Sequence, residues 1–529
     1  MSNKLDELIA SLPKKTVDTK YGSVTGYIAG GAAIFKGIPY ATPPVGALRW
    51  RPPGPPVPWK EPLITTKFGC ICPQDTTLFP AFEPMDEDCL SLNIWTPEDM
   101  HRGPYPVMVW LHGGGFITGS GSMPLYDGTY FASLGIIFIS INYRLNVLGF
   151  LAHSELTAES LSHSSGNYGL MDQIFALKWV KDNISRFGGD PGNVTIFGES
   201  AGGASVAALL SSPLAAGLFH RAIAQSSGNT PSLLRKLGES NGHLESAESL
   251  GLRFIRELGF EGEKRILEKI RALPAKELVE AWYKSIQEDV TGTGFTGSWQ
   301  INHLIIDDYV LNGSPAETFR KGMQNNVPFI TGTTADEGTV FRLFLFRGPD
   351  DLDRYKRFAG RAFGTATDKV LEQYMVRDAD SAGQAACNVL GSGFFYGARR
   401  LARSMSAIQP RTYRYLFSMP PKFFLYQIPG IADWKERFGC YHAAEIPFVF
   451  HFMALPGLQD EDRALADQIA GYWARFARTG DPNGNGAPNW PTYTQKEENY
   501  LVLDNPVKTG NGYKNKECDF VEELETARF

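Results

Sequence analysis

The stretch Val194-Thr195-Ile196-Phe197-Gly198-Glu199-Ser200-Ala201-Gly202-Gly203 contains the junction on which the fold prediction depends. Its first four residues form a short apolar, β-branched run that is typical of a buried strand. The small residues from Ala201 onward predict a helix over 201–210, which stops near Pro213. A serine on a tight turn between a strand and a helix is held out as a nucleophile.

The same G-x-S-x-G pattern occurs a second time, from Gly238 to Gly242 around Ser240. Glycine makes up about one residue in ten, so chance alone gives on the order of a third of an occurrence in a chain of this length. Ser240 follows Leu234-Arg235-Lys236-Leu237, which has no strand character. We therefore interpret Ser240 as part of a surface turn and Ser200 as the nucleophile.

Apolar runs and helical patterns alternate on the N-terminal side of this junction. Residues 106–111 and 136–142 resemble buried strands, and 173–187 has apolar residues at helical spacing before Gly188-Gly189 ends the pattern. Alternation of this kind predicts an α/β fold with a mostly parallel central sheet.

A glycine-rich turn, His112-Gly113-Gly114-Gly115-Phe116, follows directly on the first of these strands. Three glycines leave backbone amides uncovered, and fixed amide donors stabilise the negative charge that acyl transfer places on a carbonyl oxygen. A phosphate-binding loop would need a Lys-Ser/Thr pair, which the sequence lacks here. We expect the amides of Gly114, Gly115 and Ala201 to form an oxyanion hole.

The general base is expected among the histidines that follow Ser200, because a nucleophile on such a turn precedes its acid and then its histidine. Two histidines lie in the last fifth of the chain. His451 is embedded in the apolar run 447–453, where a hydrogen-bonded core histidine is the common outcome. His442 lies in a stretch without strand periodicity, just before a helical pattern, and is the better candidate.

The acid is expected at a strand end between the nucleophile and the base. The run 327–334 ends at two adjacent carboxylates, Asp336 and Glu337. Either side chain could orient His442 and stabilise its imidazolium, so the chemistry of the residues leaves this choice open.

With these motifs in place, the chain resembles a type-B carboxylesterase, the family that includes the cholinesterases. The resemblance covers nearly the whole chain and rests on residues 35–41, 87–93, 112–116, 142–144, 166–173, 187–191, 197–203, 479–483 and 490–491. It implies the α/β-hydrolase fold, with helices flanking the central sheet. We expect a single domain over residues 1–529, with cap insertions after the nucleophile helix, roughly within 229–440.

The resemblance also implies roles for individual residues. It selects Glu337 over Asp336 as the acid and matches His442 to the family base. Glu199 would tune the local electric field, and Ser226 would be a buried hydroxyl behind the catalytic residues.

The first loop has one feature that the resemblance implies and one in which this sequence departs from the family. The family pairs two cysteines around this loop, which implies a possible disulfide between Cys72 and Cys89. The segment 73–88 is short and has no tryptophan, whereas cholinesterases place one there for a quaternary ammonium group. Choline esters are therefore disfavoured.

The expected function is hydrolysis of a small-molecule carboxylic ester through an acyl-enzyme on Ser200. Acyl transfer to an alcohol or amine would use the same residues, and a non-catalytic cholinesterase-like binding protein is a further alternative. Phe295, Trp299 and Phe341 are candidates to line the substrate pocket, together with the cluster 394–396, although aromatic residues at this density more often belong to the core.

Composition excludes several other classes. The 529 residues carry a net charge of -6, which offers no basic surface for nucleic acid. No apolar run approaches the length of about 20 residues needed to span a bilayer, and residues 1–16 lack the apolar segment of a signal peptide, so a cytoplasmic location is expected. No cofactor or metal is expected, because Ser200 and His442 supply nucleophile and base.

Overall fold

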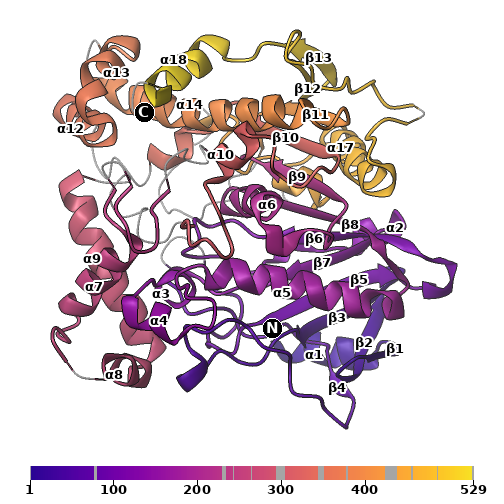
Figure 1. Ribbon diagram of the computed structural model, residues 1–529. Helices are drawn as coiled ribbons and strands as arrows, with labels where there is room; N and C mark the ends of the chain where they lie inside the picture. Colours follow the sequence, from indigo (N-terminus) through magenta and orange to yellow (C-terminus); the bar gives the residue numbers. More distant parts are fainter. Residues whose placement is uncertain are drawn as a thin grey trace.

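In the computed structural model, residues 2–76, 80–228, 234–241, 244–263, 265–293, 304–342, 351–376, 379–422, 438–453, 457–484 and 486–526 are described. Thirteen strands within these ranges form one twisted sheet that runs through the molecule (Figure 1). Their spatial order is β1-β2-β3-β5-β7-β6-β8-β9-β10-β11-β12-β13, with β4 beside β2.

The N-terminal side of the sheet is mainly antiparallel. Its strands are β1 (Lys14–Thr19), β2 (Gly22–Ala29), β3 (Ala32–Pro39), β4 (Leu63–Ile64) and β5 (Ser91–Pro97). β5 pairs antiparallel with β7, and from β7 to β12 each strand runs parallel to its neighbours before β13 closes the far edge antiparallel.

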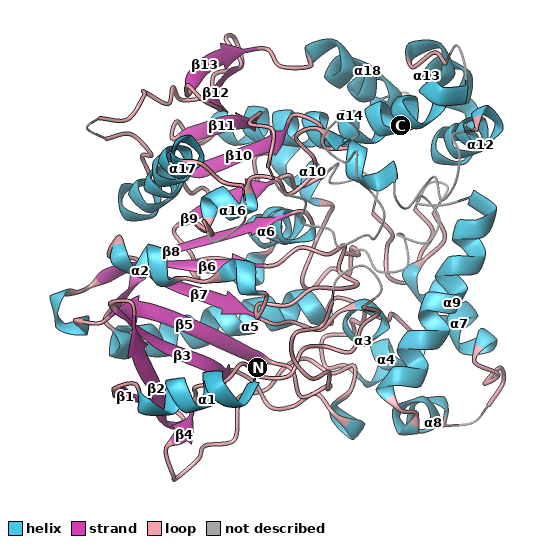
Figure 2. Ribbon diagram, turned by 180° about the vertical axis from the view of Figure 1, so that it is seen from behind, coloured by secondary structure: helices cyan, strands magenta, loops and turns pink. Residues whose placement is uncertain are grey.

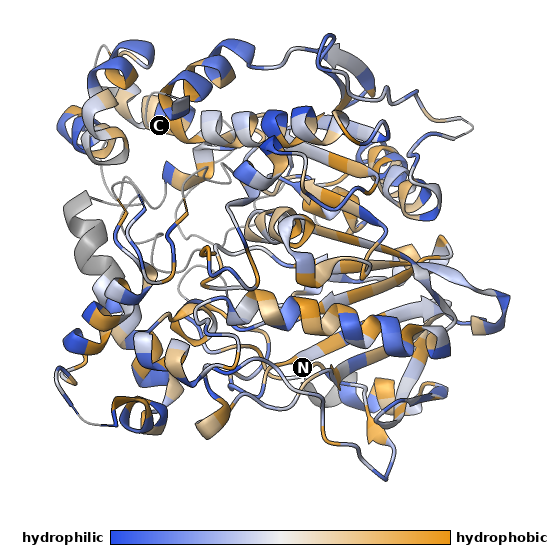
Figure 3. Ribbon diagram, viewed as in Figure 1, coloured by the Kyte–Doolittle hydropathy of each residue, from blue (hydrophilic) through white to orange (hydrophobic). Residues whose placement is uncertain are grey.

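The parallel strands are almost entirely buried because helices cover both of their faces. These strands and the closing strand are β6 (Tyr105–Leu111), β7 (Ile137–Ile141), β8 (Gly189–Glu199), β9 (Arg221–Gln225), β10 (Phe329–Thr334), β11 (Thr412–Phe417), β12 (Asn499–Leu503) and β13 (Lys508–Asn511). In Figure 3 the central strands are correspondingly rich in hydrophobic residues.

Two apolar cores lie on opposite faces of the sheet. The first includes side chains of α5 (Tyr168–Asn183), α6 (Ala201–Ser211), α10 (Pro315–Arg320) and α14 (Ala379–Ser406). The second includes side chains of α2 (Thr129–Ser133), α16 (Ile446–Val449) and α17 (Asp460–Thr479), which Figure 2 shows against the sheet. The predicted layered α/β arrangement is confirmed.

Most of the inserted helices lie beyond the carboxyl ends of the parallel strands (Figure 1), whereas α14 packs against β10 and β11 on the face of the sheet. Between β9 and β10 are α7 (Ala247–Glu257), α8 (Ile266–Ala272) and α9 (Ala275–Thr293), and between β10 and β11 are α12 (Leu352–Phe363), α13 (Thr367–Gln373) and α14. The expected cap range 229–440 therefore contains these helices, but β10 and β11 divide it. The remaining helices are α1 (Ser2–Ser11), α3 (Asn146–Phe150), α4 (Ser154–Glu159) and α18 (Asn515–Thr526).

A buried ion pair ties the loop after β7 to α5. Arg144 donates from Nε and Nη2 to the two carboxylate oxygens of Asp172, at 2.8 and 2.7 Å. The Asp172 side chain is fully buried. Removing one partner of a buried pair leaves the other charge uncompensated in a medium that solvates it poorly.

We expect Asp172→Ala to lower the free energy of unfolding by about 3–5 kcal/mol, because Arg144 then remains buried without its counter-charge. Urea unfolding followed by tryptophan fluorescence measures this. The control is Asp182→Ala, which breaks the exposed pair between Lys20 and Asp182 and should cost less than about 1 kcal/mol. Equal losses for the two variants would contradict the prediction.

Candidate active site

The turn that carries Ser200 joins β8 to α6 in a strained backbone conformation. Ser200 has φ 58° and ψ −121°, a conformation that non-glycine residues rarely adopt. Its amide donates to the carbonyl of Gln225 at the end of β9, at 3.0 Å. The side chain is half-buried, whereas that of Ser240 is exposed. The strand, turn and helix expected around Ser200 are confirmed.

Small residues around this turn are required by the closeness of neighbouring backbone. A Cβ atom on Gly202 would lie 1.9 Å from the carbonyl oxygen of Leu111, the last residue of β6. A Cβ on Gly113 would lie 3.1 Å from the Ser200 Cβ. The start of α6 and the glycine-rich loop after β6 are therefore pressed against one another, with Ser200 between them.

The amides expected to form an oxyanion hole lie in this loop and at the start of α6. Gly114 and Gly115 have positive φ values of 108° and 64°. Among the described residues, their amides donate no hydrogen bond to another group. The amide of Ala201 belongs to the first turn of α6, where helix donors have no intrahelical partner. These donors are available to an anionic oxygen near Ser200.

His442 and Glu337 are in direct contact in the protein interior. His442 Nδ1 lies 2.5 Å from Glu337 Oε2, and both side chains are buried. The other carboxylate oxygen, Oε1, accepts from the Ser226 hydroxyl at 2.5 Å and from the Thr334 amide at 2.8 Å. The carboxylate is thus fixed by two donors while it orients the imidazole.

Asp336, the other candidate for the acid, contacts the backbone of Cys440. Its Oδ2 accepts from the Cys440 amide at 2.8 Å, and its own amide donates to the Cys440 carbonyl at 3.0 Å. Asp336 therefore holds the loop that carries His442, and Glu337 contacts the imidazole itself.

Glu199 lies on the opposite side of the imidazole from Glu337. His442 Nε2 is 3.0 Å from Glu199 Oε1, in the residue directly before Ser200. Burial opposes protonation of His442, but the negative charges of Glu199 and Glu337 outweigh it and raise the pKa of His442 well above its usual value. Burial raises the pKa of Glu199, against the effect of the neighbouring imidazole.

Glu445, which the sequence analysis did not select, is a third buried carboxyl group near the site. It accepts from Gln225 Nε2 at 3.1 Å and from the Tyr415 hydroxyl at 3.3 Å. Burial, followed by the charges of Glu199 and Glu337, raises the pKa of Glu445 to about 8. Its position three residues after His442, at the start of α16, is the signal that could have identified it.

Two phenylalanine rings border the imidazole. Phe341 and Phe394 are stacked at 5.6 Å, and their centroids lie 5.3 and 4.8 Å from that of His442. Phe341 therefore lies beside the imidazole of His442, and its expected role in lining the substrate pocket stays a prediction. Phe295 and Trp299 lie outside the described residues.

The two cysteines around the first loop are free thiols. Cys89 and Cys72 are buried and contact each other, and this contact and burial raise the pKa of the Cys89 thiol. The disulfide implied by the resemblance is therefore not formed in the structure. The described residues contain no group of three or more histidine, cysteine or acidic side chains that could hold a metal, and no helix among them is long and apolar enough to cross a membrane.

Comparison with known proteins gives matches over nearly the whole chain. The model of the carboxylesterase family matches residues 13–521. The para-nitrobenzyl esterase of Bacillus subtilis (strain 168) is 35% identical over 515 residues, covering 94% of this chain and 96% of that protein. The liver carboxylesterase of Sus scrofa is 33% identical over 552 residues, covering 96% of this chain and 92% of that protein.

Solved structures agree with these matches. A PNB esterase structure has a TM-score of 0.79 at 32% identity and covers 96% of this chain and 99% of its own. A carboxylesterase of Geobacillus stearothermophilus has a TM-score of 0.77 at 34% identity, covering 95% and 98%. The similarity confirms the predicted α/β-hydrolase fold.

We expect Glu199→Gln to lower the pKa of His442, because the substitution removes one of the two negative charges that favour the imidazolium. An NMR pH titration of protein labelled at histidine Cε1 measures this pKa directly. The exposed Glu98 provides the control, since Glu98→Gln should leave the titration unchanged. An unchanged or raised His442 pKa in Glu199→Gln would show that the Glu199 charge does not stabilise the imidazolium.

Proposed function

Because the chain belongs to the carboxylesterase family and is a carboxylic ester hydrolase, we propose that Ser200, His442 and Glu337 are its catalytic triad. The observation that carries this proposal is the buried contact between His442 and Glu337 beside the strained turn of Ser200. An imidazole held by a buried carboxylate next to a serine is the arrangement that converts a weakly nucleophilic hydroxyl into an effective one.

In the first half of the reaction, the Ser200 hydroxyl oxygen attacks the ester carbonyl and its proton passes to His442. Glu337 keeps the imidazole in the required tautomer and stabilises the imidazolium. The amides of Gly114, Gly115 and Ala201 stabilise the negative carbonyl oxygen of the tetrahedral intermediate. His442 then protonates the departing alcohol, which leaves an acyl group on Ser200.

In the second half, water replaces the alcohol. His442 removes a proton from the water as it attacks the acyl carbonyl, and returns that proton to Ser200 when the acid leaves. Glu199 supports both halves because its carboxylate lies next to the imidazole, where positive charge develops. The whole reaction uses side chains and amides of this chain.

The proposed substrates are small esters with an apolar or aromatic group. Phe341 and Phe394 place aromatic surface beside the base, and such surface favours apolar groups of a ligand. The relative named a para-nitrobenzyl esterase supports aromatic esters as the first to be assayed. The location of the protein in the cell stays a prediction.

We expect Ser200→Ala to lower kcat for a p-nitrophenyl ester by several orders of magnitude, because no nucleophile remains. A fluorophosphonate probe should label wild type and fail to label this variant. Ser240→Ala, at the other G-x-S-x-G sequence, is the matched control and should retain wild-type rates and labelling. Hydrolysis by Ser200→Ala at the wild-type rate would refute the proposed nucleophile.

The adjacent carboxylates provide a second test. Glu337→Gln should lower kcat on the order of 10⁴-fold, because the amide favours the wrong imidazole tautomer. Asp336→Asn keeps a carbonyl oxygen that can accept from Cys440, so its kcat should stay within a few-fold of wild type. Steady-state kinetics with the same ester compare the two variants. A larger loss in Asp336→Asn would identify Asp336 as the acid.

A further inference from the structure

The glycine-rich loop that carries two of the candidate oxyanion donors packs against the residues that follow it in the chain. The amide of Thr118 donates to the carbonyl of Gly114 at 3.0 Å. A Cβ atom on Gly114 would lie 2.2 Å from the Thr118 carbonyl oxygen. One on Gly119 would lie 2.5 Å from the carbonyl oxygen of Gly113. Because these backbones are in such close contact, a shift of Thr118 or Gly119 moves the loop and its amides.

A glutamine from the first loop holds both Thr118 and Gly119. Gln74 is only 8% exposed. Its Oε1 accepts from the Thr118 hydroxyl at 2.5 Å and from the Gly119 amide at 2.6 Å. Its Nε2 donates to the carbonyl of Gly119 at 3.0 Å and to that of Cys72 at 2.9 Å. The acceptor and donor capacity of the side-chain amide is thus fully used within the protein.

The partners of Gln74 require a side chain that both accepts and donates. The Gly119 amide and the Thr118 hydroxyl need an acceptor, whereas the two carbonyl oxygens need a donor. A glutamate would turn a carboxylate oxygen toward these carbonyl oxygens, and a methionine fills a similar volume with neither function. Asparagine has the same amide on a shorter side chain. Glutamine is therefore the residue that matches this set of partners.

The segment that carries Gln74 is itself fixed to the framework of the sheet. The amide of Leu145 donates to Cys72 Sγ at 3.3 Å, and Asn146 Nδ2 donates to the carbonyl of Pro73 at 2.8 Å. Both donors lie at the start of α3, in the connection that follows β7. Gln74 therefore links a fixed part of the framework to the backbone behind the glycine-rich loop.

We propose that Gln74 is a positioning residue for the oxyanion hole and that it acts through Thr118 and Gly119. It holds the loop amides at the place where negative charge develops on the substrate oxygen. Stabilisation of that charge depends steeply on the position of the donors. The inference rests on the proposed function of Ser200 and its oxyanion hole, and it assigns the residue that keeps this hole in place.

Gln74→Met tests this role, because it removes the hydrogen bonds and retains most of the volume. With a p-nitrophenyl ester, kcat should fall on the order of 10- to 100-fold, because the donors lose their fixed position. KM should stay within about two-fold of wild type, because substrate binding in the ground state does not depend on these donors.

A pair of ketone inhibitors separates the transition state from the ground state. A trifluoromethyl ketone forms an adduct with Ser200 that carries a negative oxygen, and its Ki should rise in Gln74→Met by about the factor by which kcat falls. The corresponding methyl ketone binds without forming this adduct, and its Ki should equal that of wild type.

Gln409→Met is the matched control. Gln409 is also a buried glutamine whose amide is bonded at both ends, since Oε1 accepts from the Arg411 amide at 3.1 Å and Nε2 donates to Asn326 at 2.8 Å. It lies just before the amino end of β11, whereas the candidate site lies at the carboxyl ends of the strands. Its kcat and both Ki values should equal those of wild type.

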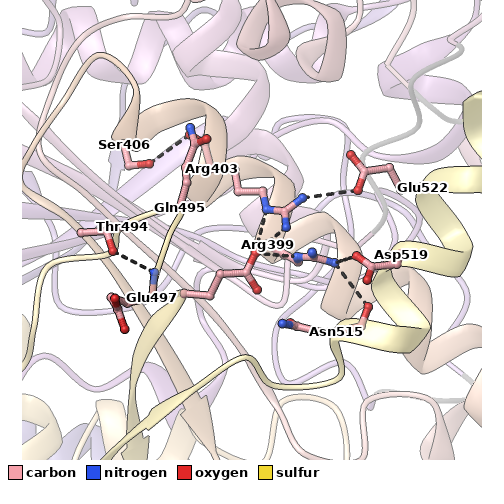
Figure 4. A network of polar contacts seen from close by, with 10 residues as sticks. Arg399, Arg403, Ser406, Thr494, Gln495, Glu497, Asn515, Asp519 and Glu522 are labelled. Atoms are coloured by element: carbon pink, nitrogen blue, oxygen red, sulfur yellow. Dashed lines mark hydrogen bonds and ion pairs between the residues drawn. The ribbon is translucent and has the colours of Figure 1, made fainter.

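A loss of stability alone is controlled at a group of ion pairs between α14 and α18 (Figure 4). Arg403 donates there to Glu498 at 2.9 Å and to Glu522 at 3.3 Å. Arg403→Met should lower the Tm, because the buried carboxylate of Glu498 loses one of its partners. Its kcat and both Ki values should equal those of wild type.

A double-mutant cycle shows whether Gln74 acts through Thr118. Thr118→Val should lower kcat less than Gln74→Met does, because the Gly119 amide still donates to Oε1. Thr118→Ser keeps the hydroxyl and should recover kcat relative to Thr118→Val. The double variant should have the kcat of Gln74→Met alone, because both substitutions remove the same interaction. Losses that multiply in the double variant would contradict the proposal.

Two results for Gln74→Met would overturn the proposal. One is a kcat and a trifluoromethyl ketone Ki equal to those of wild type. The other is a rise in KM and in the Ki of both ketones by the same factor, which would show a general distortion of the substrate site. A failure of the proposed function is distinguishable, since the trifluoromethyl ketone would then bind wild type and Ser200→Ala with the same Ki.

Discussion

The close approach of β6, β8 and the start of α6 is the constraint on which the site depends. Their backbones approach so closely that side chains do not fit between them. A Cβ atom on Gly202 would lie only 1.9 Å from the carbonyl oxygen of Leu111, so only glycine fits at this position. Because β6 and β8 are parallel and adjacent, Ser200, which directly follows β8, lies beside the free amides that follow β6. The strain at Ser200 is maintained by this packing.

Around this backbone, the interior holds three carboxyl groups and one imidazole. Each carboxyl group has a different set of partners: Glu337 is fixed by Ser226 and Thr334, Glu199 faces Nε2 of His442, and Glu445 is held by Gln225. Burial makes several negative charges expensive, so one group with a raised pKa relieves the repulsion. The protonation state of each of these groups therefore depends on the charges of the other groups in the site.

The sequence predicted those parts of the site that depend on local pattern. The turn at Ser200 follows from a strand, a glycine and a small-residue helix, and the amide loop follows from three glycines after a strand. The choice between Asp336 and Glu337 could not follow from the residues, because adjacent side chains differ only in the direction they take from a loop.

The residues of the candidate site come from distant parts of the chain. Ser226 and Glu337 are 111 residues apart, and Glu337 and His442 are separated by a further 105. Contacts of such long range form late, after the strands between them have been added to the sheet. During synthesis, a growing chain that already displays Ser200 has no base to activate it. With the proposed triad, the nascent polypeptide therefore stays inert toward esters until the segment that carries His442 has left the ribosome and folded.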